Sequence, residues 1–279
     1  INVDGTENIL KASLKNKVKR VVYISSTAVY GVPKKHPIYE NDPRIGVGPY
    51  GQSKIKAEDI CFKYIKKSLN VTIIRPKTFL GTHRLGVFEI LFDWIHDEKK
   101  IPVIGGGNNK YQLLDVDDLV EACFLFTQKN SKKYNNAFNI GAEKFNSINE
   151  DFKIMFKSIN SKSKIFSTPA FLVKKILWIF EKLKLSPLYQ WVYDTADRDS
   201  FVSIIRLTDV LNWHPKYSNS DAYYFGDSID DMKTAISAKV KPIGVLPPQD
   251  KSALLQNLLI KSGAKIVIQN INKIIEVLK

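Results

Sequence analysis

The chain of 279 residues is 44% hydrophobic, which is enough to bury a sizeable core as one large domain or two ordinary ones. Its formal net charge of +14 arises from 42 Lys and Arg against 28 Asp and Glu, and the excess is almost entirely Lys scattered along the chain. Because no aromatic-plus-Arg motif accompanies it, this charge indicates a solvated basic surface, and nucleic acid is not an expected partner.

Two segments and the two cysteines bear on the expected cellular context. Residues 1–20 mix acidic and basic side chains and lack the apolar core of a secretory signal. The most apolar window, 171–183, is interrupted by charges and is shorter than the ~20 apolar residues of a membrane span. It indicates an amphipathic helix packed on a core in preference to one lying on a membrane surface. Cys61 and Cys123 are expected to be reduced core residues, so the chain is predicted to be cytoplasmic.

The first half of the chain alternates helix and strand patterns. A helix pattern over 8–14 precedes a β-branched, nearly continuous apolar run over 18–25, as expected for a buried parallel strand. A loop rich in Pro, Gly and Asn leads to a helix over 50–67 and a second buried strand over 71–75. The alternation continues with a helix over 87–97, a strand over 101–104, a Gly-rich turn at 105–108 and a helix over 116–127. This order predicts an α/β protein with a parallel sheet.

The pattern changes twice in the second half. Beyond residues 138–141 it becomes helical, with one late strand expected near 201–204, which indicates a smaller lobe. From about residue 220 a new alternation begins. Its expected elements are a strand followed by an acidic turn, a helix ending at 238, a strand over 241–246, a helix over 251–262, a strand over 264–269 and a helix over 271–278.

Polar side chains mark the end of the first strand and the start of the next long helix. Ser25 to Gly31 follow the strand, where ligands lie in open α/β sheets. Tyr50 and Lys54 are spaced i, i+4, which places the phenol and the ammonium on one helix face. A phenol with a pKa near ~10 is a poor base, but a neighbouring cation favours phenolate, so this pair could remove a proton. The same spacing also occurs by chance on helices where both side chains only pack at the surface.

Three segments together resemble one family. They read VVYISSTAVYG from Val21, PYGQSK from Pro49 and IIRPKTFLG from Ile73. They are similar to the extended short-chain dehydrogenase/reductase family, also called the NAD-dependent epimerase/dehydratase family, over about residues 1–219. The resemblance implies a partial Rossmann-type doubly wound parallel sheet with a small substrate lobe, an NAD or NADP cofactor, and epimerisation or oxidoreduction of a small-molecule sugar, commonly a nucleotide sugar.

The resemblance also implies roles for individual residues. Ser26 matches the catalytic Ser or Thr that holds the sugar hydroxyl, Tyr50 the base, and Lys54 its partner, which also orients the nicotinamide ribose. The plain structural alternatives for Pro76 and Thr78 are a strand terminator and a helix cap. The expected cofactor contacts are Ser25, Tyr50, Lys54, Pro76 and Thr78, and the expected substrate contacts are Thr27, Arg84 and Tyr111. The helix of Tyr50 is implied as a homodimer contact.

Two departures from the family pattern bear on the substrate and the reaction. Tyr111 and Asp115 stand where many nucleotide-sugar epimerases carry an Arg for the pyrophosphate and a His, which leaves the charge to Lys110 or Arg84. Sugar 4,6-dehydratases place an Asp-Glu pair directly after the catalytic residue, where this chain has Thr27 and Ala28. Epimerisation or simple oxidoreduction is therefore expected in preference to dehydration.

The front of the chain departs further. Dinucleotide binding in this fold needs a first strand and a glycine-rich turn at a helix N-terminus, and neither pattern is found in the sequence. INVDGTEN at the start resembles a helix that the family reaches only after three or four strands. The expectation is an N-terminally truncated chain, with an incomplete NAD(P)-binding domain at 1–140 and a substrate lobe at 141–219. A catalytically dead fragment or interaction module stays open as an alternative.

Residues 220–279 resemble a different family. GDSIDD, IGVLPP and GAKIVIQNI are similar to the C-terminal part of haloacid-dehalogenase-like phosphatases, which implies a partial Rossmannoid α/β segment. The resemblance implies Asp227 as a Mg²⁺ ligand and Asp231 as its supporting carboxylate, and an acidic helix N-terminus is the plain alternative. Because the nucleophilic D-x-D segment is absent, no metal site is assigned, and a Mg-dependent phosphatase is the alternative enzyme.

Overall fold

The computed structural model describes residues 2–81, 87–158, 161–183, 193, 195–216, 223–237 and 241–270. They fall into two compact units, each with a three-stranded parallel sheet. The first comprises Ile1–Leu85, Val103–Ile148 and Ser167–Pro215, and the second comprises Gly86–Pro102, Asn149–Phe166 and Lys216–Lys279. The expected domain boundaries at residues 140 and 219 stay a prediction.

The sheet of the first unit has the strand order β1-β2-β6 and is parallel throughout. Its strands are β1 (Val21–Ile24), β2 (Val71–Pro76) and β6 (Ala137–Ile140). Every residue of β2 and β6 is buried, as expected for parallel strands that are covered on both faces. The predicted α/β class with a parallel sheet is confirmed.

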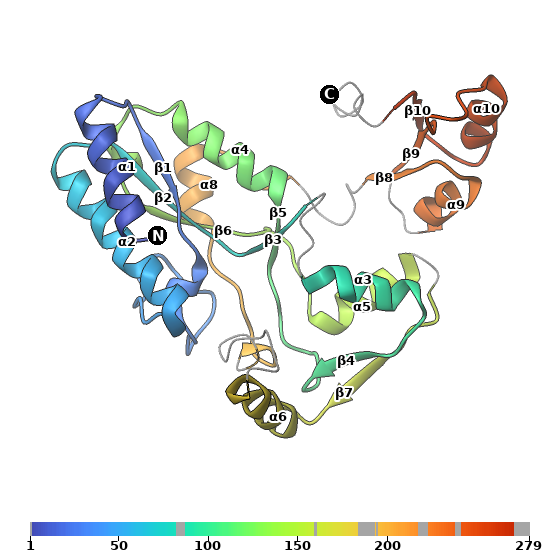
Figure 1. Ribbon diagram of the computed structural model, residues 1–279, viewed down its shortest axis with the longest axis horizontal. Helices are drawn as coiled ribbons and strands as arrows, with labels where there is room; N and C mark the ends of the chain where they lie inside the picture. Colours follow the sequence, from blue (N-terminus) through green and yellow to red (C-terminus); the bar gives the residue numbers. More distant parts are fainter. Residues whose placement is uncertain are drawn as a thin grey trace. The chain divides into compact units, whose positions relative to one another are not determined.

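Helices cover both faces of this sheet (Figure 1). One side carries α1 (Asp4–Lys15) and α2 (Gly48–Lys66), and the other carries α4 (Val116–Thr127) and α8 (Ile205–Leu211). Successive side chains of a strand point to opposite faces. Ile73 therefore joins the apolar cluster of α1 and α2, while its neighbour Ile74 joins that of α4 and α8. The apolar clusters on the two faces of the sheet fix the position of the strand ends at which the polar side chains lie.

Shorter elements link this framework. The 3-10 turn η1 (Thr27–Tyr30) follows β1, and a second 3-10 turn, η2 (Lys132–Tyr134), precedes β6. Strand β3 (Thr78–Leu80) pairs in parallel with β5 (Leu113–Asp115). Strand β4 (Ile101–Ile104) forms a two-stranded sheet with β7 (Ile165–Thr168). The strand expected near 201–204 is wrong. Val202 makes only a single bridge, to Ile38, because the Gln112 Oε1 atom accepts its backbone N–H at 2.9 Å in place of a neighbouring strand.

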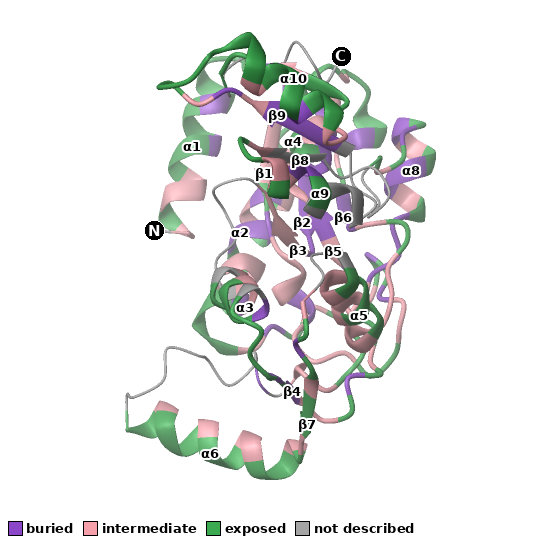
Figure 2. Ribbon diagram, turned by 90° about the vertical axis from the view of Figure 1, so that its right-hand side faces the viewer, coloured by how far each residue is buried: buried purple, intermediate pink, exposed green. Residues whose placement is uncertain are grey.

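Helix α6 (Ala170–Lys182) differs from the sequence-based expectation. The apolar window was expected to pack on a core, yet none of the residues of α6 is buried (Figure 2). Phe171 is 79% exposed and Leu172 is 52% exposed. The pattern gave the helix correctly but not its environment, because periodicity identifies an apolar face without identifying what that face contacts. Among the described helices, none is long and apolar enough to cross a membrane.

The second unit contains a parallel sheet in the order β10-β9-β8. Its elements are α3 (Val87–His96), most of α5 (Ile148–Ser158), β8 (Tyr223–Gly226), α9 (Ile229–Ser237), β9 (Lys241–Val245), α10 (Ala253–Lys261) and β10 (Ile266–Ile268). Met232, Leu246, Leu259 and Ala264 form a small buried core among them. The helix expected over 271–278 lies outside the described residues.

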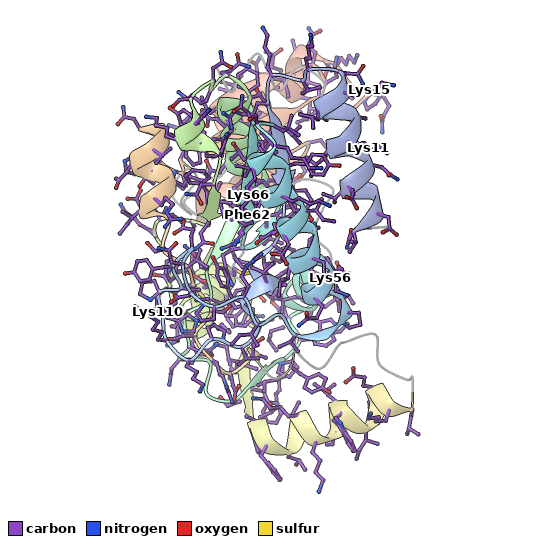
Figure 3. The ribbon with its side chains drawn as sticks, turned by 90° about the vertical axis from the view of Figure 1, so that its left-hand side faces the viewer. Lys11, Lys15, Lys56, Phe62, Lys66 and Lys110 are labelled. Carbon is purple, nitrogen blue, oxygen red and sulfur yellow. The ribbon has the colours of Figure 1, made fainter. Side chains whose placement is uncertain are left out.

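The lysine excess lies on the surface. Lys11 and Lys15 extend from α1, and Lys56 and Lys66 extend from α2, all of them exposed (Figure 3). Lysine side chains of this kind keep the charged head in water and give a solvated basic surface. An isologous dimer through α2 would bring its outer lysines toward one another, and the expected homodimer stays a prediction.

The two cysteines are both free thiols. Cys61 is completely buried in the cluster of α1 and α2, and burial raises the pKa of its thiol to about 12. Cys123 is partly buried, and burial raises its pKa to about 11. Because the thiolate is the reactive form, both side chains act as small apolar residues.

Candidate functional site

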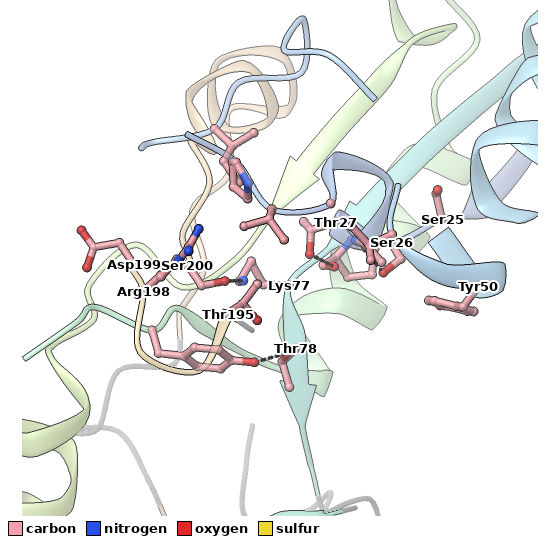
Figure 4. A pocket seen from close by; sticks show the side chains of 18 of the residues that line it. Ser25, Ser26, Thr27, Tyr50, Lys77, Thr78, Thr195, Arg198, Asp199 and Ser200 are labelled. Atoms are coloured by element: carbon pink, nitrogen blue, oxygen red, sulfur yellow. Dashed lines mark hydrogen bonds between the residues drawn. The ribbon is translucent and has the colours of Figure 1, made fainter. Parts of the chain in front are cut away.

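A cavity of about 260 Å³ opens in the first unit where β1 and β2 end. Its lining comes from the residues after β1, the start of α2, the segment 76–79, Tyr111 and the loop 195–200. These segments are far apart in the sequence, and the carboxyl ends of parallel strands bring them together. Figure 4 shows Ser26, Thr27 and Tyr50 in one part of the cavity and Lys77, Ser200 and Arg198 in another.

Ser26 and Tyr50 both line this cavity. Ser26 is the N-cap residue of η1, and its Oγ atom accepts the backbone N–H of Ala28 at 3.1 Å, which orients the hydroxyl. Tyr50 is 46% exposed, so its phenol is accessible from the cavity. The structure therefore brings the predicted hydroxyl and the predicted base into one cavity.

Lys54 contacts Tyr50 from one helical turn further along α2. Its Nζ atom lies 5.9 Å from the centre of the Tyr50 ring and donates a 2.8 Å hydrogen bond to the carbonyl oxygen of Ile24. Burial lowers the pKa of Lys54, and the nearby carboxylate of Glu58 partly offsets this. The hydrogen bond to the end of β1 ties the start of α2 to the strand that carries Ser26.

Gly51 allows α2 to approach the cavity. A Cβ atom at this position would lie 2.8 Å from the carbonyl oxygen of Ala28 in η1. That distance is too short for a carbon next to a backbone oxygen, so a larger residue would force α2 and η1 apart. Glycine at position 51 therefore sets how closely Tyr50 approaches the Ser26 turn.

A buried ionic network underlies the site. Glu58, completely buried in α2, receives hydrogen bonds from Arg75 Nε at 2.9 Å and Nη2 at 2.7 Å, and from Ser25 Oγ at 2.6 Å. Arg75 Nη1 also donates to the Tyr30 hydroxyl at 2.8 Å, which in turn donates to Asn139 at 2.7 Å. The hydrogen bonds from Arg75 pair the two charges, so the carboxylate is not left alone in the core. The network joins α2, β2, β6, η1 and Ser25, the residue that follows β1.

The predicted contacts at the strand ends lie around the same cavity. Ser25, Thr27, Pro76 and Thr78 all line it. Thr27 Oγ1 donates to the carbonyl oxygen of Pro76 at 3.2 Å, and the hydroxyls of Thr78 and Tyr111 lie 2.8 Å apart. Thr78 begins β3, so its structural alternative as a helix cap is wrong. Their roles toward cofactor or substrate stay predictions.

Two other expectations concern charge near Tyr111. Arg84 lies outside the described residues. Lys110 is exposed and does not line the cavity; its backbone N–H donates to Asp199 at 2.8 Å. Asp115 caps α4 by accepting the N–H of Asp117 at 2.8 Å.

Lys77 is a cation in the lining of the cavity that was not among the site residues expected from the sequence. Lys77 is only 6% exposed. Its Nζ atom donates to Ser200 Oγ at 2.7 Å and lies 5.1 Å from the centre of the Tyr111 ring. Burial lowers the pKa of Lys77 to about 8. The local sequence around Lys77 does not predict its burial, because its hydrogen-bond partner Ser200 is 123 residues away.

No ion pair of Lys77 is found among the described residues, and burial is the cause of its lowered pKa. Burial raises the pKa of Tyr111 and lowers that of His36, so both stay uncharged near neutral pH. Asp199, on the rim of the cavity, is exposed and accepts the backbone N–H of Lys110. A buried ammonium without a counter-charge is costly, and an anionic ligand group in the cavity would offset that cost.

Asp227 and Asp231 lie at the start of α9 in the second unit. The Asp231 carboxylate accepts hydrogen bonds from the backbone N–H of Ser228 at 3.0 Å and from the Ser228 hydroxyl at 2.7 Å. In return, Ser228 Oγ accepts the backbone N–H of Asp231 at 3.1 Å. This reciprocal arrangement is a capping box, which stabilises a helix start. In the described part of the chain no group of three or more His, Cys, Asp or Glu is arranged to hold a metal ion. The phosphatase-like interpretation stays a prediction.

Curated relatives share part of this sequence. A protein of Sinorhizobium fredii named "Uncharacterized protein y4nG" is 36% identical over 221 residues, which cover 79% of this chain and 55% of that protein. The N-acetyl-alpha-D-glucosaminyl-diphospho-ditrans,octacis-undecaprenol 4-epimerase of Escherichia coli O157:H7 is 36% identical over 124 residues, covering 43% of this chain and 37% of that enzyme. The chain spans about half the length, or less, of these two relatives.

Solved structures share the fold. The UDP-glucuronic acid 4-epimerase of Bacillus cereus, in complex with UDP-glucuronic acid and NAD, has a TM-score of 0.61 at 20% identity, covering 78% of this chain and 63% of that one. The dTDP-glucose 4,6-dehydratase of Bacillus anthracis, in complex with NAD, has a TM-score of 0.59 at 21% identity with the same coverage. The model of the NAD dependent epimerase/dehydratase family matches residues 1–141, about half of the chain. The chain belongs to the NAD dependent epimerase/dehydratase family.

Proposed function

We propose that the chain carries the hydride-transfer site of an NAD-dependent epimerase or oxidoreductase that acts on a diphosphate-linked sugar. The observation that carries the proposal is that Ser26 and Tyr50 line one cavity while the Lys54 ammonium lies 5.9 Å from the Tyr50 ring. A hydroxyl, a phenol and a cation are the groups that proton removal from a sugar alcohol needs.

The described residues fit the nicotinamide end of NAD. Lys54 supplies an ammonium at the end of β1, where a ribose hydroxyl could accept a hydrogen bond, and Tyr50 leaves an accessible phenol beside it. Pro76 and Thr78 line the same cavity. When bound, NAD would supply the acceptor for the hydride.

The chain's own residues handle the proton. Ser26 holds the sugar hydroxyl by hydrogen bonding, and Tyr50 removes its proton as hydride leaves the carbon that bears it. Lys54 places its positive charge 5.9 Å from the Tyr50 ring, next to the group that accepts the proton. Thr27 and Ala28 follow Ser26 and carry no carboxylate that could eliminate water. The proposed reaction is therefore epimerisation or simple oxidoreduction.

Lys77 is proposed to contact an anionic part of the substrate. It supplies positive charge 5.1 Å from the Tyr111 ring, where the chain lacks the Arg that many epimerases use for the pyrophosphate. The related enzyme of Escherichia coli O157:H7 is named for a sugar diphosphate carried on undecaprenol, and the structurally similar enzyme of Bacillus cereus binds UDP-glucuronic acid. Both compounds offer a diphosphate to such a cation.

The test titrates NAD⁺ and NADH into the protein by calorimetry and measures turnover of UDP-glucose and UDP-N-acetylglucosamine. Tyr50→Phe should retain cofactor binding and lose at least 100-fold in turnover, because it keeps the ring and removes the proton acceptor. Tyr39→Phe is the matched control, since Tyr39 is 47% exposed and does not line the cavity. Equal turnover by Tyr50→Phe and the wild type would refute the assignment of the base. Absence of cofactor binding by the wild type would favour the catalytically inactive alternative.

A further inference from the structure

Helix α6 presents an apolar stripe to solvent. Its members recur at i, i+4, i+7, i+8 and i+11, which places them on one helix face. They are Leu172 (52% exposed), Ile176 (41%), Ile179 (40%), Phe180 (44%) and Leu183 (61%), the last being the C-cap residue. We call these five residues the α6 stripe. Soluble proteins seldom expose contiguous large apolar side chains, and such patches mark interaction surfaces.

The opposite side of α6 holds the helix to the rest of its unit. Lys174 forms an ion pair with Asp197 at 2.5 Å, and Glu181 accepts a hydrogen bond from the Tyr193 hydroxyl at 2.6 Å. Val173 and Leu177 on this side are less exposed than the stripe. These contacts fix which face points outward, so exposure of the stripe follows from the way the helix is attached.

Positive charge borders the stripe. Lys175 and Lys182 are exposed, and Lys182 Nζ lies 5.8 Å from the ring of Trp178, which is itself 45% exposed. Large apolar residues on one face with Lys at its border are features of helices that lie in the interface of a bilayer. The lysines complement anionic lipid headgroups, and the chain as a whole carries a net charge of +14.

The attachment of α6 leads directly to the rim of the cavity. Asp197, the partner of Lys174, lies between Thr195 and Arg198, which both line the cavity. Gly105 packs against the same point, because a Cβ atom there would lie 3.1 Å from the Cβ of Asp197. A surface bound to α6 would therefore be coupled to the part of the cavity that contains Lys77 and Ser200.

We propose that α6 binds the surface of an anionic lipid bilayer through the α6 stripe, so that the cavity takes a sugar diphosphate carried on a membrane lipid. The membrane contact stands on α6 alone, and the identity of the substrate rests on the proposed function. A sugar linked to a long apolar lipid cannot leave the bilayer, so an enzyme that acts on it gains from a helix that holds its cavity at the headgroups.

The first experiment measures binding to vesicles by co-sedimentation. Vesicles of phosphatidylglycerol and phosphatidylcholine are compared with vesicles of phosphatidylcholine alone. The wild type should bind the anionic vesicles, and the double variant Ile176→Ser/Ile179→Ser should bind them at least 10-fold more weakly. The control is Leu254→Ser/Leu258→Ser on α10, whose side chains are 71% and 39% exposed, and it should bind like the wild type. Far-ultraviolet circular dichroism establishes that both variants are folded.

A second pair of variants tests the charge. Lys175→Gln/Lys182→Gln should weaken binding to the anionic vesicles by about 30-fold, because each lysine near such a surface contributes on the order of 1 kcal/mol. Lys11→Gln/Lys15→Gln on α1 removes the same net charge from another exposed helix and should change binding by less than 3-fold. An equal loss in both pairs would mean that overall charge binds the lipid, and would overturn the assignment to α6.

Other outcomes also decide the proposal. A wild type that stays in the supernatant with both kinds of vesicle overturns it. A dimer in gel filtration that Ile176→Ser/Ile179→Ser dissociates, without vesicle binding, would assign the α6 stripe to a second copy of the chain and overturn the membrane contact. The proposed chemistry is tested separately. Tyr50→Phe should still bind vesicles while losing turnover, whereas the α6 variants should keep turnover of a water-soluble sugar nucleotide.

Discussion

The Nη2 atom of Arg75 lies 2.7 Å from the Oε2 atom of Glu58, and the two side chains are 2% and 0% exposed. This ion pair joins β2 to α2 directly beneath the cavity. Removing one partner of a buried pair leaves a charge without compensation, which costs more than the pair itself contributes.

Glu58→Gln should therefore lower the free energy of unfolding by about 3–5 kcal/mol, because Arg75 would keep its charge and lose its carboxylate. Urea denaturation monitored by tryptophan fluorescence measures this change. The matched control is Asp59→Asn, which removes the ion pair between Arg44 and the exposed Asp59 at 2.7 Å and leaves the 3.1 Å contact of Arg44 with Glu58 in place. The control should change the free energy by less than about 1 kcal/mol. Equal effects of the two changes would show that burial does not matter here.

Lys77 should make the stability depend on pH in an alkaline range. Its pKa falls from 10.5 in the unfolded chain to about 8 in the folded protein, so the unfolded chain binds more protons between these values. This group alone raises the free energy of unfolding by about 3 kcal/mol as the pH increases from 8 to 10.5. The same stabilisation is lost when the pH is lowered again to the folded-state pKa of about 8. Burial lowers the pKa of the nearby His36 from its usual value of 6.5, which is already below this range.

Lys77→Met removes this contribution and the buried charge. At pH 7 the variant should be more stable than the wild type by about 1–3 kcal/mol, and the difference should shrink as pH rises toward 10. Urea denaturation at several pH values measures both effects. Lys144→Met, at an exposed position, carries the same charge change and should show neither effect. A constant difference across the pH range would show that the Lys77 ammonium is not destabilising.

Gly51 and Gly5 offer a matched pair of helical glycines. Gly51→Ala should lower the free energy of unfolding by about 1–3 kcal/mol, because the new Cβ would lie 2.8 Å from the Ala28 carbonyl oxygen. Gly5→Ala in α1 meets no atom within 4 Å and should raise it by about 0.5–1 kcal/mol. Thermal unfolding of both variants decides the matter. A neutral Gly51→Ala would mean that η1 yields easily to α2.

Asp231 and Asp227 distinguish a capping role from a metal role. Asp231→Ala should destabilise α9 by about 0.5–2 kcal/mol through loss of the capping box with Ser228, and Asp227→Ala, at an exposed position, should have a smaller effect. Hydrogen exchange of residues 229–237 measures this difference. Protection of α9 that rises with added Mg²⁺ in the wild type, and not in Asp227→Ala, would contradict a purely capping role.

Local patterns in the sequence predicted the central elements well. The strand expected over 71–75 is β2 at Val71–Pro76, and the helix expected over 50–67 is α2 at Gly48–Lys66. Both have strong local causes: β-branched apolar residues in the strand, and in the helix a proline in the first turn after a glycine-rich loop. The sequence also indicated that Ser26 and Tyr50 lie at strand and helix ends, from which a shared cavity follows.

What the sequence could not predict depends on contacts between distant segments. Lys77 is buried because Ser200 comes to it from 123 residues away, and no local pattern announces that contact. The stretch 201–204 looked like a strand, but the Gln112 side chain occupies the place of a strand partner. The environment of α6 was mistaken for the same reason. Periodicity describes the helix itself, whereas its exposure depends on what the rest of the chain leaves uncovered.

The network around Glu58 gives the inner and outer faces of α2 different tolerance to substitution. Glu58 lies eight residues after Tyr50, about 12 Å along the helix, and clamps the inner face to β1 and β2. The clamp fixes the rotation of the helix without any contribution from its outer face. Lysines such as Lys56 and Lys66 can therefore be exchanged for other residues to alter solubility or association while the phenol of Tyr50 keeps its position.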